Sequence, residues 1–146
     1  LTLACDLRIM SQEASLIEVF INVGLIPDSG STYFLPRLVG YGKAFEWAVT
    51  AHRISAQEAE RYGMANAVVP PYQVLPTARE WAARLAQAPT VAIGLTKRAF
   101  NRSVLNDLET QLEYEAMLQE VAGRTEDHQE GVQAFLEKRP PQFKGR

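Results

Sequence analysis

Apolar residues in the second half of the chain recur every three to four positions, which is the spacing of amphipathic helices. The stripes cover residues 74–86, 92–100 and 105–121. A fourth helix is predicted to begin at Thr125, because Glu126 and Asp127 then lie in its first turn, where the helix dipole favours negative charge. It is expected to end before Pro140. The second half is therefore predicted to be a set of amphipathic helices.

The first half instead alternates short apolar runs with turn-forming residues. The pattern predicts a strand within Leu7–Ser11 and a second extended segment over Ser15–Phe20. Glycine, proline, aspartate and serine are dense in Gly24–Gly30, which is typical of a loop. We expect this loop to lead into a helix that begins near Ser29.

Two short elements close the first half. Ser55 and Glu58 have the spacing of a capping box, and Gly63 lies where a left-handed residue ends a helix, so a short helix is predicted between them. Ala67–Val69 is predicted to be a strand that ends at Pro70.

The end of that strand is also the predicted domain boundary, which separates residues 1–70 from residues 71–146. Four helices without a sheet of their own must bury their apolar faces on other elements. The first domain or neighbouring subunits can supply those surfaces, so we expect the chain to form an oligomer.

The composition is that of an ordinary globular protein, since 47% of the 146 residues are hydrophobic and 22% are charged. A net charge of −2 and the lack of a Lys/Arg cluster argue against a nucleic-acid or membrane partner. No apolar run approaches the roughly 20 residues that span a bilayer.

The single cysteine, Cys5, favours a reducing compartment, so we predict a cytoplasmic protein. Because the chain begins at Leu1 rather than methionine, we also expect upstream sequence.

Asp28 is the strongest candidate for chemistry, because its loop is flanked by apolar side chains. The flanking residues are Leu25, Ile26, Tyr33 and Phe34. Apolar walls would raise the pKa of the Asp28 carboxyl group and make it a usable proton shuttle. The residues alone leave an alternative open, in which Asp28 is the N-cap of the following helix.

The other reactive side chains lack suitable partners. Glu18 lies between two apolar residues of an extended segment and is expected to face solvent. Cys5 has no histidine nearby in the sequence and is expected to be a buried structural thiol. His52 and His128 show no metal-ligand spacing, so we expect no metal site. The GxSxG elbow and the glycine-rich nucleotide motifs are absent, which argues against a serine hydrolase and a nucleotide-binding protein.

Five segments occur in the order typical of the crotonase (enoyl-CoA hydratase/isomerase) superfamily, which the whole chain resembles. They are Leu3–Arg8, Gly24–Gly30, Leu35–Gly40, Arg53–Ala56 and parts of Thr125–Arg139. The resemblance implies an α/β, crotonase-like (ClpP/crotonase) spiral of ββα units, of which this chain would be the C-terminal part, followed by a helical trimerisation region. It also implies a homotrimer or dimer of trimers that binds acyl-CoA thioesters. Coenzyme A would enter as part of the substrate, with no permanently bound cofactor.

The resemblance also bears on the reaction. Hydratases of this superfamily use two glutamates, one just before the position of Leu1 and one at the position of Phe20, and phenylalanine cannot transfer a proton. Asp28, by contrast, matches the catalytic aspartate of the dienoyl-CoA isomerases. Its loop is similar to that of the phenylacetate-pathway isomerases, whose tails also resemble Ala122–Thr125 and Pro141–Phe143.

We therefore predict an acyl-CoA isomerase that shifts a double bond or rearranges a ring epoxide through an enolate, with Asp28 as the proton shuttle. The two backbone amides that stabilise the enolate in this superfamily should precede Leu1. Lys138 matches a position near the phosphates of coenzyme A, or is a solvated surface cation. The residues expected around the acyl group are Phe20, Leu25, Ile26, Pro27, Tyr33 and Phe34. An enoyl-CoA hydratase and an inactive oligomerising module stay open as alternatives.

Overall fold

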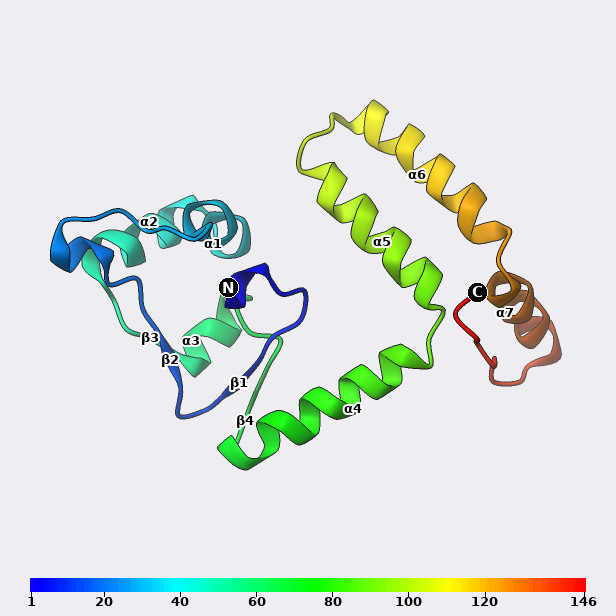
Figure 1. The fold of residues 1–146 in the computed structure, drawn as a ribbon, viewed down its shortest axis with the longest axis horizontal. Coiled ribbons are helices and arrows are strands. Elements are labelled where there is room, and N and C mark those ends of the chain that lie inside the picture. Colours follow the sequence, from blue (N-terminus) through cyan, green and yellow to red (C-terminus); the bar gives the residue numbers. More distant parts are fainter. The chain divides into compact units, whose positions relative to one another are not determined.

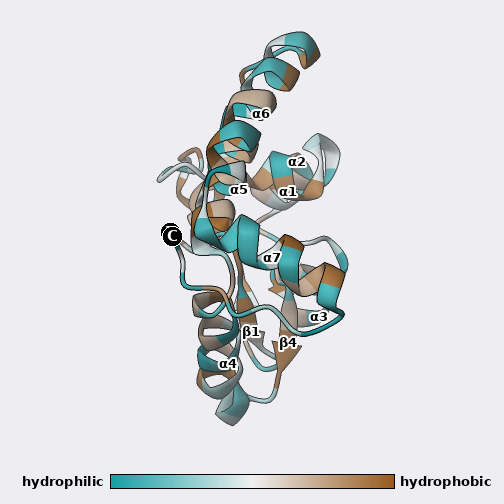
Figure 2. Cartoon of the chain, turned by 90° about the vertical axis from the view of Figure 1, so that its right-hand side faces the viewer, coloured by the Kyte–Doolittle hydropathy of each residue, from teal (hydrophilic) through white to brown (hydrophobic).

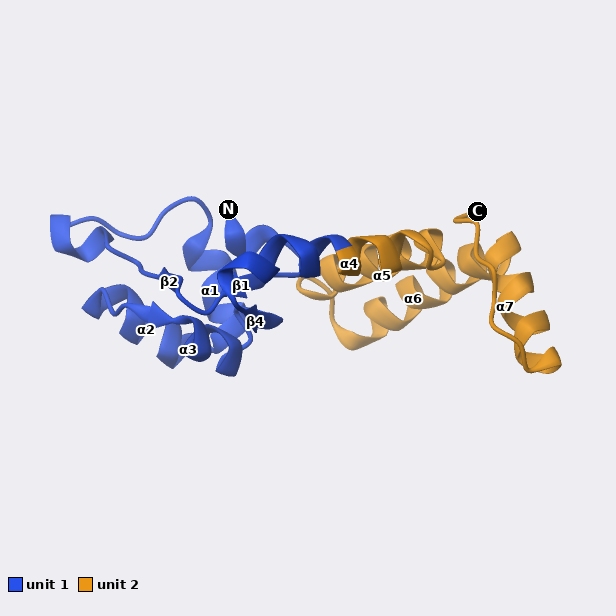
Figure 3. Ribbon diagram, turned by 90° about the horizontal axis from the view of Figure 1, so that it is seen from below, with its two compact units in different colours: residues 1–79 blue, residues 80–146 orange.

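The computed structural model describes all residues from 1 to 146, and the chain divides into two compact units. Figure 3 colours these units, which comprise Leu1–Arg79 and Glu80–Arg146. The division lies inside helix α4 (Val74–Ala86), later in the chain than the predicted boundary after residue 70. A short 3₁₀ turn, η3 (Pro71–Gln73), leads directly into α4, so the first turns of this helix stay with the first unit.

Four short strands form two small sheets in the first unit. Strand β1 (Ile9–Ser11) pairs in parallel with β4 (Ala67–Val69), while β2 (Ser15–Leu16) pairs antiparallel with β3 (Ile54–Ser55). The strands predicted within 7–11 and at 67–69 are confirmed. The predicted extended segment is cut short, because its last residue already begins a 3₁₀ turn, η2 (Phe20–Val23).

Three helices complete the first unit, and each of them contributes side chains to its core. They are α1 (Ser31–Val39), α2 (Tyr41–Thr50) and α3 (Ala56–Arg61), and Figure 1 shows α1 and α2 side by side. A short 3₁₀ turn, η1 (Thr2–Ala4), lies at the start of the unit. The buried centre consists of Leu35, Ala44, Trp47, Ile54, Ala59, Met64 and Ala65.

The capping box forms at the start of α3 as predicted. Ser55 Oγ accepts a hydrogen bond from the Glu58 amide at 3.2 Å, and a Glu58 carboxylate oxygen accepts one from the Ser55 amide at 3.0 Å. His52 Nε2 lies 3.0 Å from the other Glu58 oxygen, and the His52 ring stacks on Trp47. Gly63 follows the helix with a left-handed φ of 76°, also as predicted.

This cap gives a pH-dependent contribution to stability. The amide and then the hydroxyl of Ser55, together with His52, hold the pKa of Glu58 at about 2, below its ordinary value of 4.5. A carboxyl group with a lowered folded-state pKa stabilises the fold above its unfolded pKa, and this stability is lost as pH falls through the folded pKa. We expect Glu58→Gln to lower the thermal midpoint at neutral pH, and the difference from wild type to shrink between pH 4.5 and pH 2.

The matched control for that prediction is Glu60→Gln, on the exposed side of the same helix. Its midpoint should follow wild type at every pH. The assigned pKa would be contradicted if the thermal midpoint of Glu58→Gln stayed below that of wild type by the same amount from neutral pH down to pH 2.

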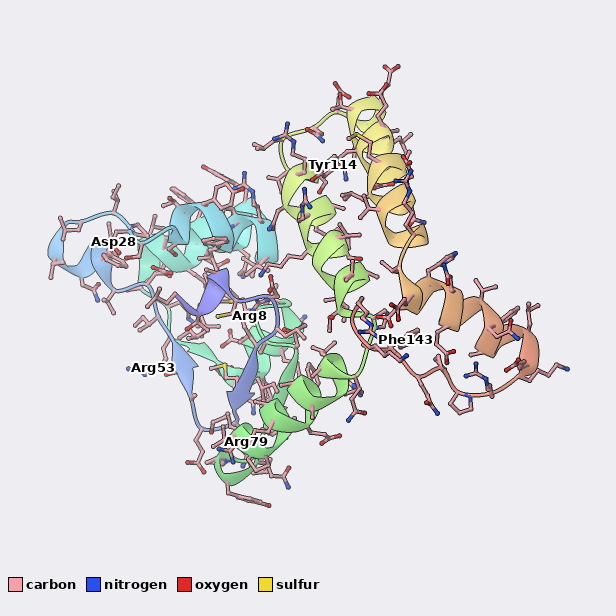
Figure 4. The ribbon with its side chains drawn as sticks, turned by 45° about the vertical axis from the view of Figure 1, so that its right-hand side comes forward. Arg8, Asp28, Arg53, Arg79, Tyr114 and Phe143 are labelled. Atoms are coloured by element: carbon pink, nitrogen blue, oxygen red, sulfur yellow. The ribbon has the colours of Figure 1, made fainter.

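Arg8 ties the start of the chain to the turn after α3. Its Nε donates to the Met64 carbonyl at 2.5 Å, and its terminal nitrogens donate to the carbonyls of Cys5 and Gly63. The Arg8 backbone amide also donates to Asn66 Oδ1 at 2.8 Å. Cys5 itself is exposed, so the prediction of a buried structural thiol is wrong for this chain. Arg8, rather than the thiol, packs against the neighbouring turn (Figure 4).

The second unit contains the predicted helices α5 (Thr90–Ser103), α6 (Leu108–Gly123) and α7 (Glu126–Glu137). Figure 1 shows α5 and α6 as a helical hairpin. The side-chain amide of the buried Gln111 donates through Nε2 across this hairpin to the Ala99 carbonyl at 3.2 Å. Leu105, which was predicted within the third helix, lies before α6 because Asp107 is its N-cap.

The predicted start of α7 is confirmed, because Thr125 Oγ1 caps the helix by accepting from the His128 amide at 3.1 Å. The chain beyond α7 folds back on this helix. Asp127 is only 3% exposed, and its two oxygens accept from the amides of Lys144 at 2.6 Å and Gly145 at 2.8 Å. Asp127 therefore anchors the C-terminal tail as well as lying in the first turn of a helix.

Several large apolar side chains of the second unit are exposed. Figure 2 shows hydrophobic bands between hydrophilic ones along α7. The exposed side chains include Phe100, Leu108, Met117, Val132, Phe135 and Leu136. None of the helices combines the length and the apolar character that crossing a membrane would require.

Candidate functional site

Asp28 occupies the first position of a tight turn that leads into α1. The Ser31 amide donates to the Asp28 carbonyl at 2.8 Å, and the two residues between them are left-handed, with φ of 51° at Ser29 and 83° at Gly30. This is the backbone pattern of a type I′ turn. A left-handed serine costs roughly 1–2 kcal/mol, because its Cβ lies too close to the following carbonyl group. The turn is therefore a strained feature held by its surroundings.

The turn decides between the two interpretations of Asp28 that the sequence left open. Helix α1 begins at Ser31, its N-cap is Gly30, and no side chain caps it. The Asp28 carboxylate accepts instead from Ser29 Oγ at 2.8 Å. The N-cap interpretation is thus wrong, because two left-handed residues place Asp28 outside the capping position.

A pocket of about 300 Å³ opens beside this turn. Asp28 lies on its rim within the loop before α1 (Figure 4), and its side chain is exposed. Polar and aromatic groups from three segments meet in this pocket, namely Glu18, Phe20, Asp28, Ser29, Ser31 and Phe34. The Asp28 carboxylate borders a pocket without an imidazole, and it can accept and return a proton, which is general acid–base chemistry.

The apolar loop residues that precede Asp28 line a different pocket. Leu25, Ile26 and Pro27 border a space of about 320 Å³ on the side of α1 and α2. Ile26 is 79% exposed, so these side chains do not wall in the Asp28 carboxylate in this chain as the sequence suggested. Ser31 borders both pockets. The role of Leu25, Ile26 and Pro27 in binding a substrate stays a prediction.

The two aromatic residues of α1, Tyr33 and Phe34, also lie in different surroundings. Phe34 lines the Asp28 pocket, whereas Tyr33 packs under the Arg37 guanidinium group, whose Cζ lies 3.7 Å from the ring centroid. The two rings meet edge to face at 5.2 Å. Phe20 begins η2 and lines the Asp28 pocket.

Glu18 is the residue that the sequence interpretation missed. It was expected to face solvent, but it is half-buried, lines the Asp28 pocket and accepts a hydrogen bond from Ser31 Oγ. The signal was present in the spacing. In the extended segment that the sequence predicted, Glu18 and Phe20 would share one face, and Phe20 was already assigned to the site.

The remaining candidates belong to other elements. Lys138 is exposed at the left-handed C-cap of α7, in the second compact unit. His52 bonds to Glu58 in the capping box, and the His128 amide is capped by Thr125. No three His, Cys, Asp or Glu side chains are grouped so that they could hold a metal ion.

The profile of the enoyl-CoA hydratase/isomerase family matches residues 1–146 of this sequence. The chain belongs to this family. A Rhodobacter capsulatus protein named probable enoyl-CoA hydratase is 44% identical over 146 residues, which are 100% of this chain and 57% of that protein. The 1,2-epoxyphenylacetyl-CoA isomerase of Escherichia coli is 42% identical, with 100% of this chain and 56% of that protein covered.

Solved structures of the family agree with the fold. The enoyl-CoA hydratase of Bacillus anthracis matches with a TM-score of 0.92 and 42% identity over 99% of this chain and 56% of that chain. An enoyl-CoA hydratase/isomerase of Cupriavidus metallidurans matches with a TM-score of 0.92 and 35% sequence identity, and the match covers 99% of this chain and 54% of that chain. The predicted crotonase superfamily and fold are thus confirmed, over a chain that spans little more than half the length of these relatives. Its place at the C-terminal end of the spiral stays a prediction.

Proposed function

We propose that this chain contributes the proton-transferring part of an acyl-CoA isomerase. One observation carries the proposal: Asp28 and Phe20 line the same pocket. By the resemblance, Phe20 stands at the position where hydratases carry a glutamate. A hydration site needs groups that activate water and deliver its proton, whereas a shift of one proton needs a single base. The relative named 1,2-epoxyphenylacetyl-CoA isomerase supports this choice.

The reaction would begin with a thioester whose carbonyl oxygen is held by two backbone amides, as the resemblance implies. Asp28 removes a proton from a carbon next to the conjugated system, the C–H electron pair moves into the acyl group, and negative charge develops on the thioester oxygen. The carboxylic acid formed at Asp28 then returns the proton to another carbon. No water is added, and no oxidation occurs.

Hydration is the second candidate, because two observations favour it. Relatives at 44% and 37% identity carry the name hydratase. The Asp28 pocket also contains a second carboxylate, Glu18, which could take the place of the glutamate missing at Phe20.

A direct assay of the full-length protein separates these candidates. Crotonyl-CoA tests addition of water, and a 3-enoyl-CoA tests migration of a double bond to the 2-position. The proposal expects isomerisation at a rate far above that of hydration. Hydration as the faster reaction would replace the proposal with the second candidate, and the lack of both reactions together with retained acyl-CoA binding would indicate an inactive module.

The partners follow from the same proposal. Acyl-CoA is the ligand, coenzyme A enters as part of the substrate, and no resident cofactor is needed for the proton shift. Lys138 is exposed, as an ammonium group that meets the coenzyme A phosphates has to be.

We further propose that the helices of the second unit mediate assembly into a trimer or dimer of trimers. On α7, Val132, Phe135 and Leu136 are 47%, 82% and 69% exposed, and their i, i+3, i+4 spacing places them on one side of the helix. Exposed apolar groups gathered in this way mark an interface. We expect Phe135→Ser to shift the full-length protein to smaller species in sedimentation velocity. Gln129→Ser, an exposed polar position on the same helix, is the control. An unchanged sedimentation coefficient for Phe135→Ser would contradict this role.

A further inference from the structure

The turn that presents Asp28 has a strained backbone conformation. Ser29 has a left-handed φ of 51°, a region that L-amino acids rarely adopt and that persists only where the surroundings enforce it. Within the turn, Ser29 Oγ donates to the Asp28 carboxylate at 2.8 Å. This bond orients the carboxylate but does not attach the turn to the rest of the unit.

Ser31 provides that attachment. Its amide donates to the Asp28 carbonyl at 2.8 Å, and its hydroxyl donates to the carboxylate of Glu18. Glu18 lies on a different segment, between β2 and η2, and is half-buried in the wall of the same pocket. A hydrogen bond to a charged acceptor in a half-buried site is among the stronger polar contacts of a protein.

We propose that Glu18 is a positioning residue for Asp28 and acts through the Ser31 hydroxyl group. This inference rests on the proposed function, in which Asp28 transfers the proton. By holding Ser31, Glu18 fixes both the end of the turn and the first residue of α1, and so sets where the Asp28 carboxylate meets the substrate. Proton transfer depends steeply on such placement, because the base must lie within hydrogen-bonding reach of the proton.

This role needs a hydrogen-bond acceptor at position 18, not an ionisable group. Glutamine retains a carbonyl oxygen that can accept from the Ser31 hydroxyl group, while alanine removes the acceptor. At position 31, threonine retains the donor and alanine removes it. These two pairs of variants separate positioning from proton transfer by Glu18 itself.

The experiment measures kcat, KM and the thermal midpoint of the full-length isomerase. We expect Glu18→Ala and Ser31→Ala each to lower kcat by about tenfold to a hundredfold, the effect of losing one charge-assisted hydrogen bond. KM should change little, and the thermal midpoint should fall only by the amount that the loss of one hydrogen bond causes. Glu18→Gln and Ser31→Thr should recover most of the activity, and the double alanine variant should be no worse than either single one, because both remove the same bond. Glu13→Ala, an exposed glutamate of the same unit, is the control.

Two results would overturn the inference. If Glu18→Gln loses as much activity as Glu18→Ala, the carboxylate itself transfers a proton. If Glu18→Ala keeps wild-type kcat while Asp28→Asn is inactive, Asp28 needs no support from Glu18. Asp28→Asn with full activity is a separate outcome, which refutes the proposed function and removes the basis of the inference with it.

Discussion

Asp28→Asn is expected to lower isomerase turnover by about 10²–10⁴-fold, the usual contribution of a positioned acid–base group. Asparagine has nearly the same shape as aspartate, and its side-chain oxygen can still accept the hydrogen bond that Ser29 Oγ donates over 2.8 Å. The turn should therefore persist while the proton acceptor is lost. The measurement is kcat for double-bond migration in a 3-enoyl-CoA, with binding of a non-reactive acyl-CoA followed in parallel.

The appropriate control is Asp6→Asn, an exposed aspartate of the same unit that lies outside the Asp28 pocket. It should retain wild-type kcat. Unchanged isomerisation in Asp28→Asn would show that Asp28 only shapes the turn, and the family assignment would still hold because it rests on the whole chain. Loss of binding together with turnover would instead indicate a defect in the pocket.

Trp47→Ala is expected to destabilise the protein by about 3–5 kcal/mol, the cost of removing a large aromatic side chain from a packed core. Trp47 lies on α2, is 1% exposed and meets Tyr62 edge to face with ring centroids 5.3 Å apart. It belongs to the same buried core cluster as Leu35 and Ile54, so its removal would leave a cavity in the core of the first unit. The measurement is the urea midpoint of the full-length protein, followed by circular dichroism.

Trp81→Ala is the matched control, because it removes the same side chain from a half-buried position on α4. Trp81 contacts the Arg84 guanidinium group at 5.8 Å from its ring centroid rather than a core cluster. Its effect should be clearly smaller than that of Trp47→Ala. Equal urea midpoints for the two variants would contradict the placement of Trp47 in the core of the first unit.

The position of Glu18 also changes how the missing hydratase glutamate is interpreted. The resemblance implies only that Phe20 stands where hydratases carry a carboxylate. The structure places Glu18 in the same pocket, two residues earlier, with its carboxylate bonded to Ser31. A carboxylate held by a hydroxyl donor is suited to orienting a neighbour, which is why we prefer positioning to proton transfer.

The sequence by itself determined the features that depend on neighbouring residues. The capping box at Ser55, the cap at Thr125 and the four amphipathic helices follow from local hydrogen bonding and from the period of the helix, which the residues themselves encode. The ordered motifs were also enough to identify the family, because five weak local patterns in one order are specific together.

Only the tertiary structure decided which side chains meet. The left-handed residues at 29 and 30 exclude Asp28 from the helix cap, and the contact between Glu18 and Ser31 joins residues 13 positions apart. Likewise, the buried Asp127 anchors the amides of a tail 17 and 18 positions further along the chain. Such contacts depend on where whole segments pack, and the pattern of apolar and polar residues constrains only the face that a side chain occupies, not the partner that it finds there.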